Sequence, residues 1–209
     1  MREITIKEIL EYLDEIGEEY SFIGDKDDTV KGFSSLKNYK DNSFTWIKNQ
    51  NNILDLSATK NIALVFTDYS VNGTFKNAIK TSNSKKLFFC TIDHFYSVDQ
   101  ERSPIGQYTY IGPNVSLGEN VTIGHNCTLD GDIVIGDNTT IWNNVSVINK
   151  VRIGSNSEIQ SGCVIGHDGF GYTENDDHKK TMIKHYGGVT IGNNVLISSN
   201  VCVVRGTID

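Results

Sequence analysis

Residues 111–166 read IGPNVSLGENVTIGHNCTLDGDIVIGDNTTIWNNVSVINKVRIGSNSEIQSGCVIG. A branched aliphatic residue recurs at every sixth position of this stretch and of the residues just before it. The series is Ile105, Ile111, Leu117, Ile123, Leu129, Ile135, Ile141, Val147, Ile153, Ile159 and Ile165. An α-helix repeats at about 3.6 residues and an amphipathic strand at about two, so neither explains a period of six. A fixed short repeat predicts a solenoid of stacked coils.

Three positions after most of these aliphatic residues lies a small or polar residue: Asn114, Asn120, Asn126, Asp132, Asn138, Asn144, Asn156, Gly162 and Asp168. Asn, Asp and Gly tolerate left-handed backbone angles, so each repeat predicts one short strand and one tight corner. Three repeats make a triangular coil, in which Asn120, Asn138 and Asn156 stack and hydrogen-bond from coil to coil. We predict a mainly β fold, with a parallel β-helix over 101–209.

The repeat is interrupted once, by HDGFGYTENDDHKKTMIKHYGG at 167–188. It resumes with Ile191, Ile197 and Val203 in the aliphatic position. The interruption therefore predicts a loop extruded from a continuing solenoid at about 167–188. Loops on rigid scaffolds often carry binding or catalytic residues.

The first 100 residues lack this period and indicate a small α/β domain. Spaced apolar residues predict an amphipathic helix over about 5–16, ended by Gly17. Apolar runs bounded by polar residues predict strands at 43–47, 61–66 and 86–92. The segments near 50–57 and 74–81 are candidates for short helices.

Composition excludes several classes of function. A net charge of −7 argues against a nucleic-acid-binding surface, which needs a basic stripe. Neither a signal peptide nor an apolar run long enough to span a membrane is present in the sequence. The cysteines Cys90, Cys127, Cys163 and Cys202 form no CxxC pair, so we expect no metal site and reduced thiols in a cytoplasmic protein.

Two segments of the chain carry a resemblance to a known family. They are VIGHDGFGYTENDDHKKTMIKHYGGVTIGNNV at 164–195 with RGTID at 205–209, and GFSSLKNYKDNSFTWIKN at 32–49. The chain resembles the UDP-3-O-(3-hydroxyacyl)glucosamine N-acyltransferases of lipid A biosynthesis, with the likeness weakest between residues 65 and 100.

The resemblance implies a left-handed β-helix, a homotrimer and a uridine-binding domain at 1–100. It also implies transfer of a 3-hydroxyacyl group from acyl carrier protein to the amine of a UDP-amino sugar, without a covalently bound cofactor. Two alternatives stay open: an acetyl-CoA-dependent nucleotide-sugar N-acetyltransferase, and a non-catalytic trimeric scaffold that binds sugar nucleotides. A long apolar groove beside the DGFGY segment favours transfer of a 3-hydroxyacyl group, and a short groove favours transfer of an acetyl group.

The family's catalytic histidine is expected beyond Asp209, so transfer is expected to be impaired in the sequence as given. The candidate general bases within the chain are His167 and His125, since histidine has a suitable pKa for accepting a proton from an amine nucleophile. Both lie just before a corner position, where a solvated residue with no catalytic role is the alternative interpretation.

The resemblance also implies substrate-binding residues. An aromatic residue and an asparagine hold the uracil ring in that family, at positions that match Trp46 and Asn49. A strand tryptophan in the core with a turn asparagine is the alternative. Independently of the resemblance, Asp168, Gly169, Phe170, Gly171 and Tyr172 form a glycine-hinged aromatic loop that is a candidate to line an acyl or pantetheine groove. The alternative is that its rings fold back onto the wall of the solenoid. Trp142 stands where most repeats have a small residue, and we expect it to face outward at a subunit interface.

Overall fold

The structure is a computed structural model that describes residues 2–48, 62–68, 75–98 and 103–209. It divides into two compact units, Met1–Asp99 and Gln100–Asp209, which are described separately. The expected helix near 50–57 and the candidate residue Asn49 lie outside the described residues.

The first unit is a four-stranded sheet packed against two helices. The sheet has the order β2-β6-β5-β4, in which β4, β5 and β6 run parallel and β2 pairs antiparallel with β6. Its elements are β1 Ile4–Thr5, α1 Ile6–Glu15, β2 Ser21–Ile23, β3 Thr29–Val30, the 3₁₀ turn Leu36–Asn38, β4 Phe44–Ile47, β5 Leu64–Thr67, β6 Ala78–Lys80 and α2 Ser84–Tyr96. The side chains of Leu13, Phe44, Phe66 and Leu87 join both helices and the sheet in one buried cluster.

The helix predicted over about 5–16 and the strands predicted at 43–47 and 61–66 are confirmed by α1, β4 and β5. Two other predictions are wrong. The run 86–92 belongs to α2, because Leu87 and Thr91 are buried one helical turn apart, and a short apolar run does not distinguish a strand from a buried helix. The segment 74–81, predicted as a helix, contains β6.

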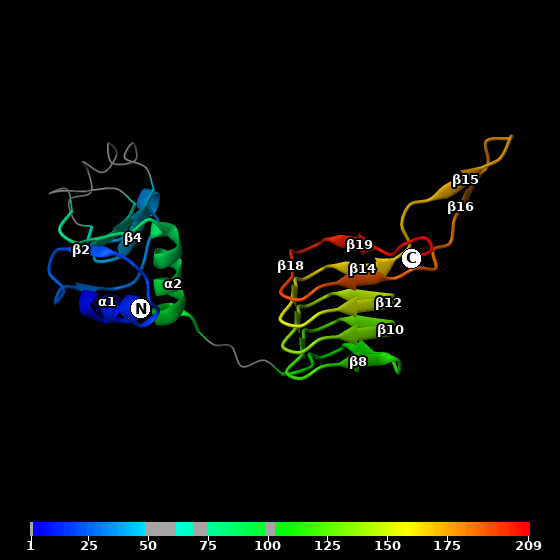
Figure 1. The fold of residues 1–209 in the computed structure, drawn as a ribbon, viewed down its shortest axis with the longest axis horizontal. Helices are drawn as coiled ribbons and strands as arrows, with labels where there is room; N and C mark the ends of the chain where they lie inside the picture. Colours follow the sequence, from blue (N-terminus) through cyan, green and yellow to red (C-terminus); the bar gives the residue numbers. More distant parts are fainter. Residues whose placement is uncertain (1, 49–61, 69–74, 99–102) are drawn as a thin grey trace. The chain divides into compact units, whose positions relative to one another are not determined.

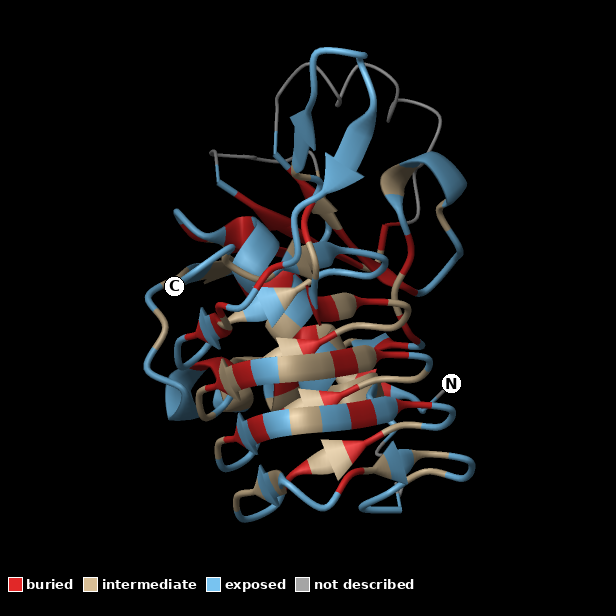
Figure 2. Ribbon diagram, turned by 90° about the vertical axis from the view of Figure 1, so that its right-hand side faces the viewer, coloured by how far each residue is buried: buried red, intermediate tan, exposed pale blue. Residues whose placement is uncertain are grey.

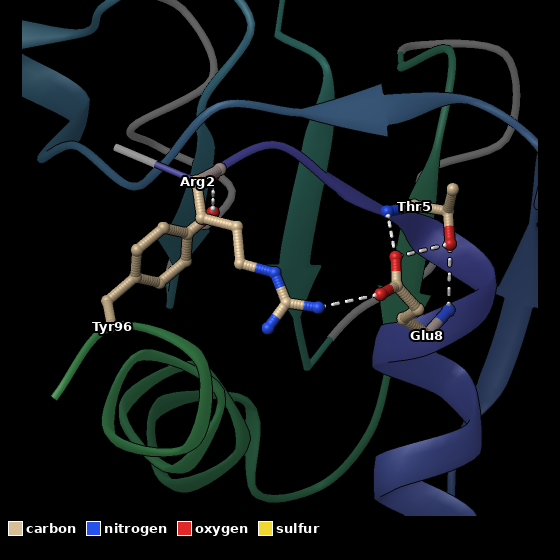
Figure 3. Close-up of polar contacts among 4 residues, drawn as sticks. All are labelled: Arg2, Thr5, Glu8 and Tyr96. Carbon is tan, nitrogen blue, oxygen red and sulfur yellow. Dashed lines mark hydrogen bonds and ion pairs between the residues drawn. The ribbon is translucent and has the colours of Figure 1, made fainter.

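A capping box begins α1. The Glu8 carboxylate accepts hydrogen bonds from the Thr5 backbone N–H (2.7 Å) and hydroxyl (2.9 Å), and the Thr5 hydroxyl accepts one from the Glu8 N–H (3.1 Å). Figure 3 shows that Arg2 extends the network, since its guanidinium donates to Glu8 and its carbonyl accepts from the Tyr96 hydroxyl. The start of the chain is thereby joined to the last turn of α2.

Replacing Thr5 by alanine is expected to lower the free energy of unfolding of the first unit by about 1 kcal/mol, the typical cost of losing a helix cap. Thr5→Ser keeps the hydroxyl and is expected to cost much less. Urea unfolding followed by Trp46 fluorescence measures the stability of both variants. The substitution Trp142→Phe removes the fluorescence of the other unit. Equal midpoints for the alanine and serine variants would contradict the assigned role of the hydroxyl.

The second unit is a parallel β-solenoid with three walls. Strands pair in parallel with residues 18 positions later, as in Leu129 with Val147 and Ile141 with Ile159, until the extruded loop lengthens the interval. Wall A carries the row Ile111, Leu129, Val147, Ile165 and Val203; wall B carries Leu117, Ile135, Ile153 and Ile191; wall C carries Ile105, Ile123, Ile141, Ile159 and Ile197. The predicted aliphatic series is therefore confirmed as the stacked rows of one solenoid.

The strands of this unit are short except for two. They are β7 Tyr110–Ile111, β8 Val115–Leu117, β9 Thr122–Ile123, β10 Thr128–Ile135, β11 Thr140–Ile141, β12 Ser146–Ile153, β13 Glu158–Ile159, β14 Val164–His167, β15 Tyr172–Glu174, β16 Lys180–Met182, β17 Val189–Ile191, β18 Leu196–Ile197 and β19 Cys202–Val204. Figure 2 shows buried residues alternating with exposed or intermediate ones along the long strands. The buried aliphatic residues of the three walls form one hydrophobic cluster.

Two of the three corners in each coil follow the prediction. Positive φ angles occur at Asn120, Asn126, Asn138, Asn144, Asn156, Asn194, Asn200 and Gly162. Asn120 also donates a 3.2 Å hydrogen bond to Asn138 in the next coil.

The predicted positions of the third corner are wrong, because Asn114, Asp132 and Asp168 have no positive φ. The chain there passes from wall A to wall B as one bent strand in β10 and β12. The unusual backbone angles occur at Gly131 (φ 146°) and Asn149 (φ 65°).

The interruption predicted at 167–188 leaves the solenoid after β14 and returns at β17. Its outer part is the antiparallel hairpin β15–β16, which projects from the stack of coils in Figure 1. In the part of the chain that the structure describes, every helix is too short or too polar to cross a membrane.

Candidate functional site

A hollow of about 410 Å³ lies in the first unit, where the parallel strands β4, β5 and β6 end and α2 begins. Its lining residues are Trp46, Lys48, Asp68, Ser82, Asn83, Ser84, Lys85, Lys86 and Phe89. The carboxyl ends of parallel strands are a common place for ligands in α/β proteins, and the N-terminus of a helix favours anionic groups.

A hydrogen bond to a residue of α2 fixes the position of Trp46 in this hollow. The indole N–H donates a 2.8 Å hydrogen bond to the hydroxyl of Ser84, which is buried in the first turn of the helix. The Lys85 ammonium lies 5.9 Å from the centre of the indole ring, and Phe89 is 51% exposed nearby. Lys86 pairs with Glu18. The hollow thus combines an aromatic face with cations at a helix N-terminus, an arrangement suited to a ring that carries a phosphate.

A second, smaller hollow of about 250 Å³ lies on wall C of the solenoid, where its lining includes His125 and Trp142. Gly106 and Gly124 precede Trp142 in the same outward-facing position of successive coils, so neither of these two positions puts a side chain into the space beside the indole. The Trp142 N–H donates to the Glu158 carboxylate at 2.8 Å.

The His125 ring is exposed, but one of its nitrogens is engaged. Its Nδ1 accepts a 2.8 Å hydrogen bond from the backbone N–H of Gln107. A backbone N–H can only donate, so Nδ1 is unprotonated and the neutral ring carries its proton on Nε2. This tautomer makes His125 a hydrogen-bond donor toward solvent, and accepting a proton would require loss of the contact with Gln107.

The candidate residues of the DGFGY segment, in the extruded loop, fall into a group packed against the solenoid and an exposed group. His167, at the end of β14, is exposed. Gly169 is buried against the solenoid, whereas Phe170 is 87% exposed and Tyr172 is 39% exposed. The two aromatic rings meet edge to face, with centroids 5.6 Å apart. Phe170 and Tyr172 therefore form one outward aromatic surface, and Asp168 and Gly169 belong to its support.

Asp168 forms an ion pair with Arg205, a residue whose role the sequence did not reveal. Hydrogen bonding from the Arg205 guanidinium holds the pKa of Asp168 below its ordinary value. A lowered carboxyl pKa means that the pair contributes stability at neutral pH and loses it as the pH falls through the pKa of the folded state. The RGTID segment shows Arg205 in the sequence, but its partner lies 37 positions earlier.

The candidate residues do not form one cluster within either unit. Trp46 belongs to the first unit, whereas His125, His167 and the DGFGY loop belong to the second. Within the second unit, His125 follows β9 and lines the hollow on wall C, whereas His167 ends β14 on wall A. Of the two candidate bases, His167 is thus the one that adjoins the aromatic loop.

A comparison with models of protein families identifies the class of repeat in the solenoid. Residues 132–167 match the family described as "Bacterial transferase hexapeptide (six repeats)". This segment covers parts of all three walls, and its six-residue period is the one that forms the solenoid.

Similar proteins of known name include several UDP-3-O-acylglucosamine N-acyltransferases. One such protein, number 2 of Legionella pneumophila strain Philadelphia 1, is 49% identical over 57 residues, which are 27% of this chain and 16% of the relative. The enzyme of Shewanella denitrificans is 46% identical over 56 residues, with the same coverage of 27% and 16%. The chain thus resembles these acyltransferases, and the match spans about a sixth of the relatives' length.

Among solved structures, a GDP-perosamine N-acetyl transferase from Caulobacter crescentus, in complex with CoA and GDP-perosamine, is 19% identical to the chain. The superposition covers 97% of this chain and 85% of the other, with a TM-score of 0.28.

Proposed function

We propose that the chain belongs to an N-acyltransferase that acylates the amine of a UDP-amino sugar, with a 3-hydroxyacyl thioester of acyl carrier protein as donor. The observation that carries the proposal is the hollow of the first unit, in which an indole face adjoins lysines and a helix N-terminus. Partial identity to UDP-3-O-acylglucosamine N-acyltransferases supports the class of reaction and a role in lipid A biosynthesis.

In this proposal the first unit binds the uridine diphosphate. Trp46 stacks on the uracil ring, and the amide of Asn49 pairs with the donor and acceptor groups of the base. Lys85 and the first turn of α2 stabilise the diphosphate, because backbone N–H groups and a cation both favour negative charge.

The second unit supplies the acyl-transfer site. We propose that its solenoid is left-handed, that three copies assemble as a cytoplasmic homotrimer, and that Trp142 lies at their interface. Phe170 and Tyr172 form an apolar surface on the loop, with Asp168, Gly169 and Gly171 as its frame, suited to an acyl chain or the pantetheine arm. The sugar amine attacks the thioester carbonyl, a base removes the ammonium proton, and the thiol leaves as the amide bond forms.

An acyl-transfer assay with a UDP-amino sugar tests the function, with 3-hydroxyacyl thioesters of acyl carrier protein and acetyl-CoA as alternative donors. We expect transfer from the carrier-protein thioester to be faster than transfer from acetyl-CoA. Transfer from acetyl-CoA alone would make the protein an N-acetyltransferase. Absence of transfer from both donors, together with retained binding of UDP, would identify a sugar-nucleotide-binding scaffold and contradict the proposal.

The same assay compares the two candidate bases. We propose that His167 is better placed than His125, because the His125 Nδ1 is already engaged by Gln107 and its Nε2 carries the proton. We therefore expect His167→Ala to lower kcat more than His125→Ala does, by about 10²–10⁴-fold if His167 is the base. Equal kcat values for wild type and both variants would assign the proton transfer to another group.

A further inference from the structure

Contacts with residues that follow the loop in the sequence hold the two ends of the extruded loop. It leaves the solenoid at His167 and returns at Val189, and its own hairpin joins only β15 to β16. The segment 205–207, which follows β19, lies against both ends of the loop. The orientation of the loop is therefore decided at this junction rather than at the hairpin.

Arg205 holds the outgoing end of the loop. Its Nε and Nη2 each lie 2.6 Å from Asp168 Oδ1, and its backbone N–H donates to the His167 carbonyl at 2.9 Å. The Arg205 side chain is only 12% exposed and that of Asp168 is 31% exposed. A planar guanidinium with two fixed donors sets the direction of the carboxylate, which a lysine ammonium does not do.

The returning end of the loop is held by the same short segment. The Tyr186 N–H donates to the Thr207 carbonyl at 2.9 Å, and the Gly187 N–H donates to the Gly206 carbonyl at 3.0 Å. Asp168 also reaches across the base of the loop, where its Oδ2 accepts a long hydrogen bond of 3.4 Å from the His185 N–H. Both ends therefore converge on Asp168 and residues 205–207.

A buried histidine fills the space between the two ends. His185 is only 6% exposed, and its ring Nδ1 donates a 3.0 Å hydrogen bond to the Ile183 carbonyl. A side chain added at Gly169 would place its Cβ 3.1 Å from His185 Nε2, and one at Gly171 would lie 3.6 Å from the ring. The backbone on both sides of Phe170 thus packs close to this ring, while the Phe170 side chain remains exposed.

We propose that Asp168 and Arg205 are positioning residues for acyl transfer: their ion pair, with His185 behind it, sets the direction of the Phe170–Tyr172 surface toward the acyl donor. The role in transfer rests on the proposed function, whereas the role in orienting the loop does not. Neither residue touches the reacting atoms in this assignment. Both act by fixing where the aromatic surface lies.

Hydrogen exchange tests the orienting role directly. In Arg205→Lys and Asp168→Asn we expect exchange of the amides at 169–186 to accelerate by about 10-fold or more, an opening equilibrium shifted by one order of magnitude. Exchange in the coils at 110–160 is expected to stay at its wild-type rate. Arg152→Lys is the matched control, because Arg152 forms the same kind of ion pair with Asp132 on the exposed surface of the solenoid.

The kinetic test uses the same variants of the full chain. We expect the KM for the acyl donor to rise about 10-fold while the KM for the UDP-amino sugar stays within about 2-fold, because the loop contacts only the donor in this proposal. Unchanged loop exchange, or exchange raised equally throughout the solenoid, would overturn the orienting role. Faster loop exchange with unchanged donor KM would overturn the role in transfer. Absence of transfer by the wild-type protein would instead refute the proposed function, and the exchange result would still decide the orienting role.

Discussion

Replacing Gly131 by alanine is expected to destabilise the solenoid by several kcal/mol, although it adds a single methyl group. Gly131 has a φ of 146°, a region that is open to glycine and strained for other residues. An added Cβ would lie 2.0 Å from the carbonyl oxygen of Asn149, its partner in the next coil. Backbone strain of about 1–3 kcal/mol adds to an overpacking cost of about 1–3 kcal/mol, and the clashing atom is backbone that cannot rotate away.

Gly192 provides the matched control for this substitution. It lies in the same solenoid, its φ is not positive, and a Cβ built there meets nothing within 4 Å. Gly192→Ala is therefore expected to leave the free energy of unfolding nearly unchanged. Urea unfolding followed by Trp142 fluorescence in a Trp46→Phe background compares the two. Similar midpoints for Gly131→Ala and Gly192→Ala would show that the bend of β10 adapts to a side chain.

The solenoid could be predicted from sequence because its period is local and redundant. Eleven successive aliphatic residues at one spacing identify the coil, and Asn138 or Asn156 alone would identify little. The third corner escaped prediction because it is shifted by one position within the repeat. Gly131 and Asn149 pair in successive coils and lie two positions after the aliphatic residue, whereas the residues at the other two corners lie three positions after it.

The first unit lacks such redundancy, and its misassigned helix α2 shows the consequence. The run 86–92 has the composition of a strand. Its helical register becomes evident only in the folded unit, where Leu87 and Phe88 join the buried cluster of the sheet and Thr91 is buried one turn later. Burial on one face, rather than intrinsic propensity, decided the element.

The candidate site was predictable only in part. Trp46 was identified through a resemblance, whereas Ser84 and Lys85 join it only because parallel strands end at the start of α2. Likewise, Arg205 carries no local signal, since its contact with Asp168 spans 37 residues and depends on the loop returning to the solenoid. Contacts that only the tertiary structure creates leave no local pattern in the sequence.

Binding of UDP is expected to weaken by about 10–100-fold in Trp46→Ala, because aromatic stacking on a base contributes about 1–3 kcal/mol and each 1.4 kcal/mol is tenfold in Kd. Trp46→Phe keeps a ring but loses the hydrogen bond to Ser84, so we expect a smaller loss, within about 10-fold. Isothermal titration calorimetry measures both variants, since removing Trp46 also removes the fluorescent reporter.

Two controls separate stacking from charge. Trp142→Phe changes the other tryptophan, in the second unit, and is expected to leave the Kd for UDP unchanged. Uridine without phosphates is expected to bind more weakly than UDP, and the difference should shrink as salt rises, because exposed lysines such as Lys85 are screened. If Trp46→Ala binds UDP as tightly as the wild type, the indole is a core residue, as the alternative interpretation of the FTWIKN segment holds. In that case the nucleotide is bound elsewhere and the hollow at the strand ends loses its assigned ligand.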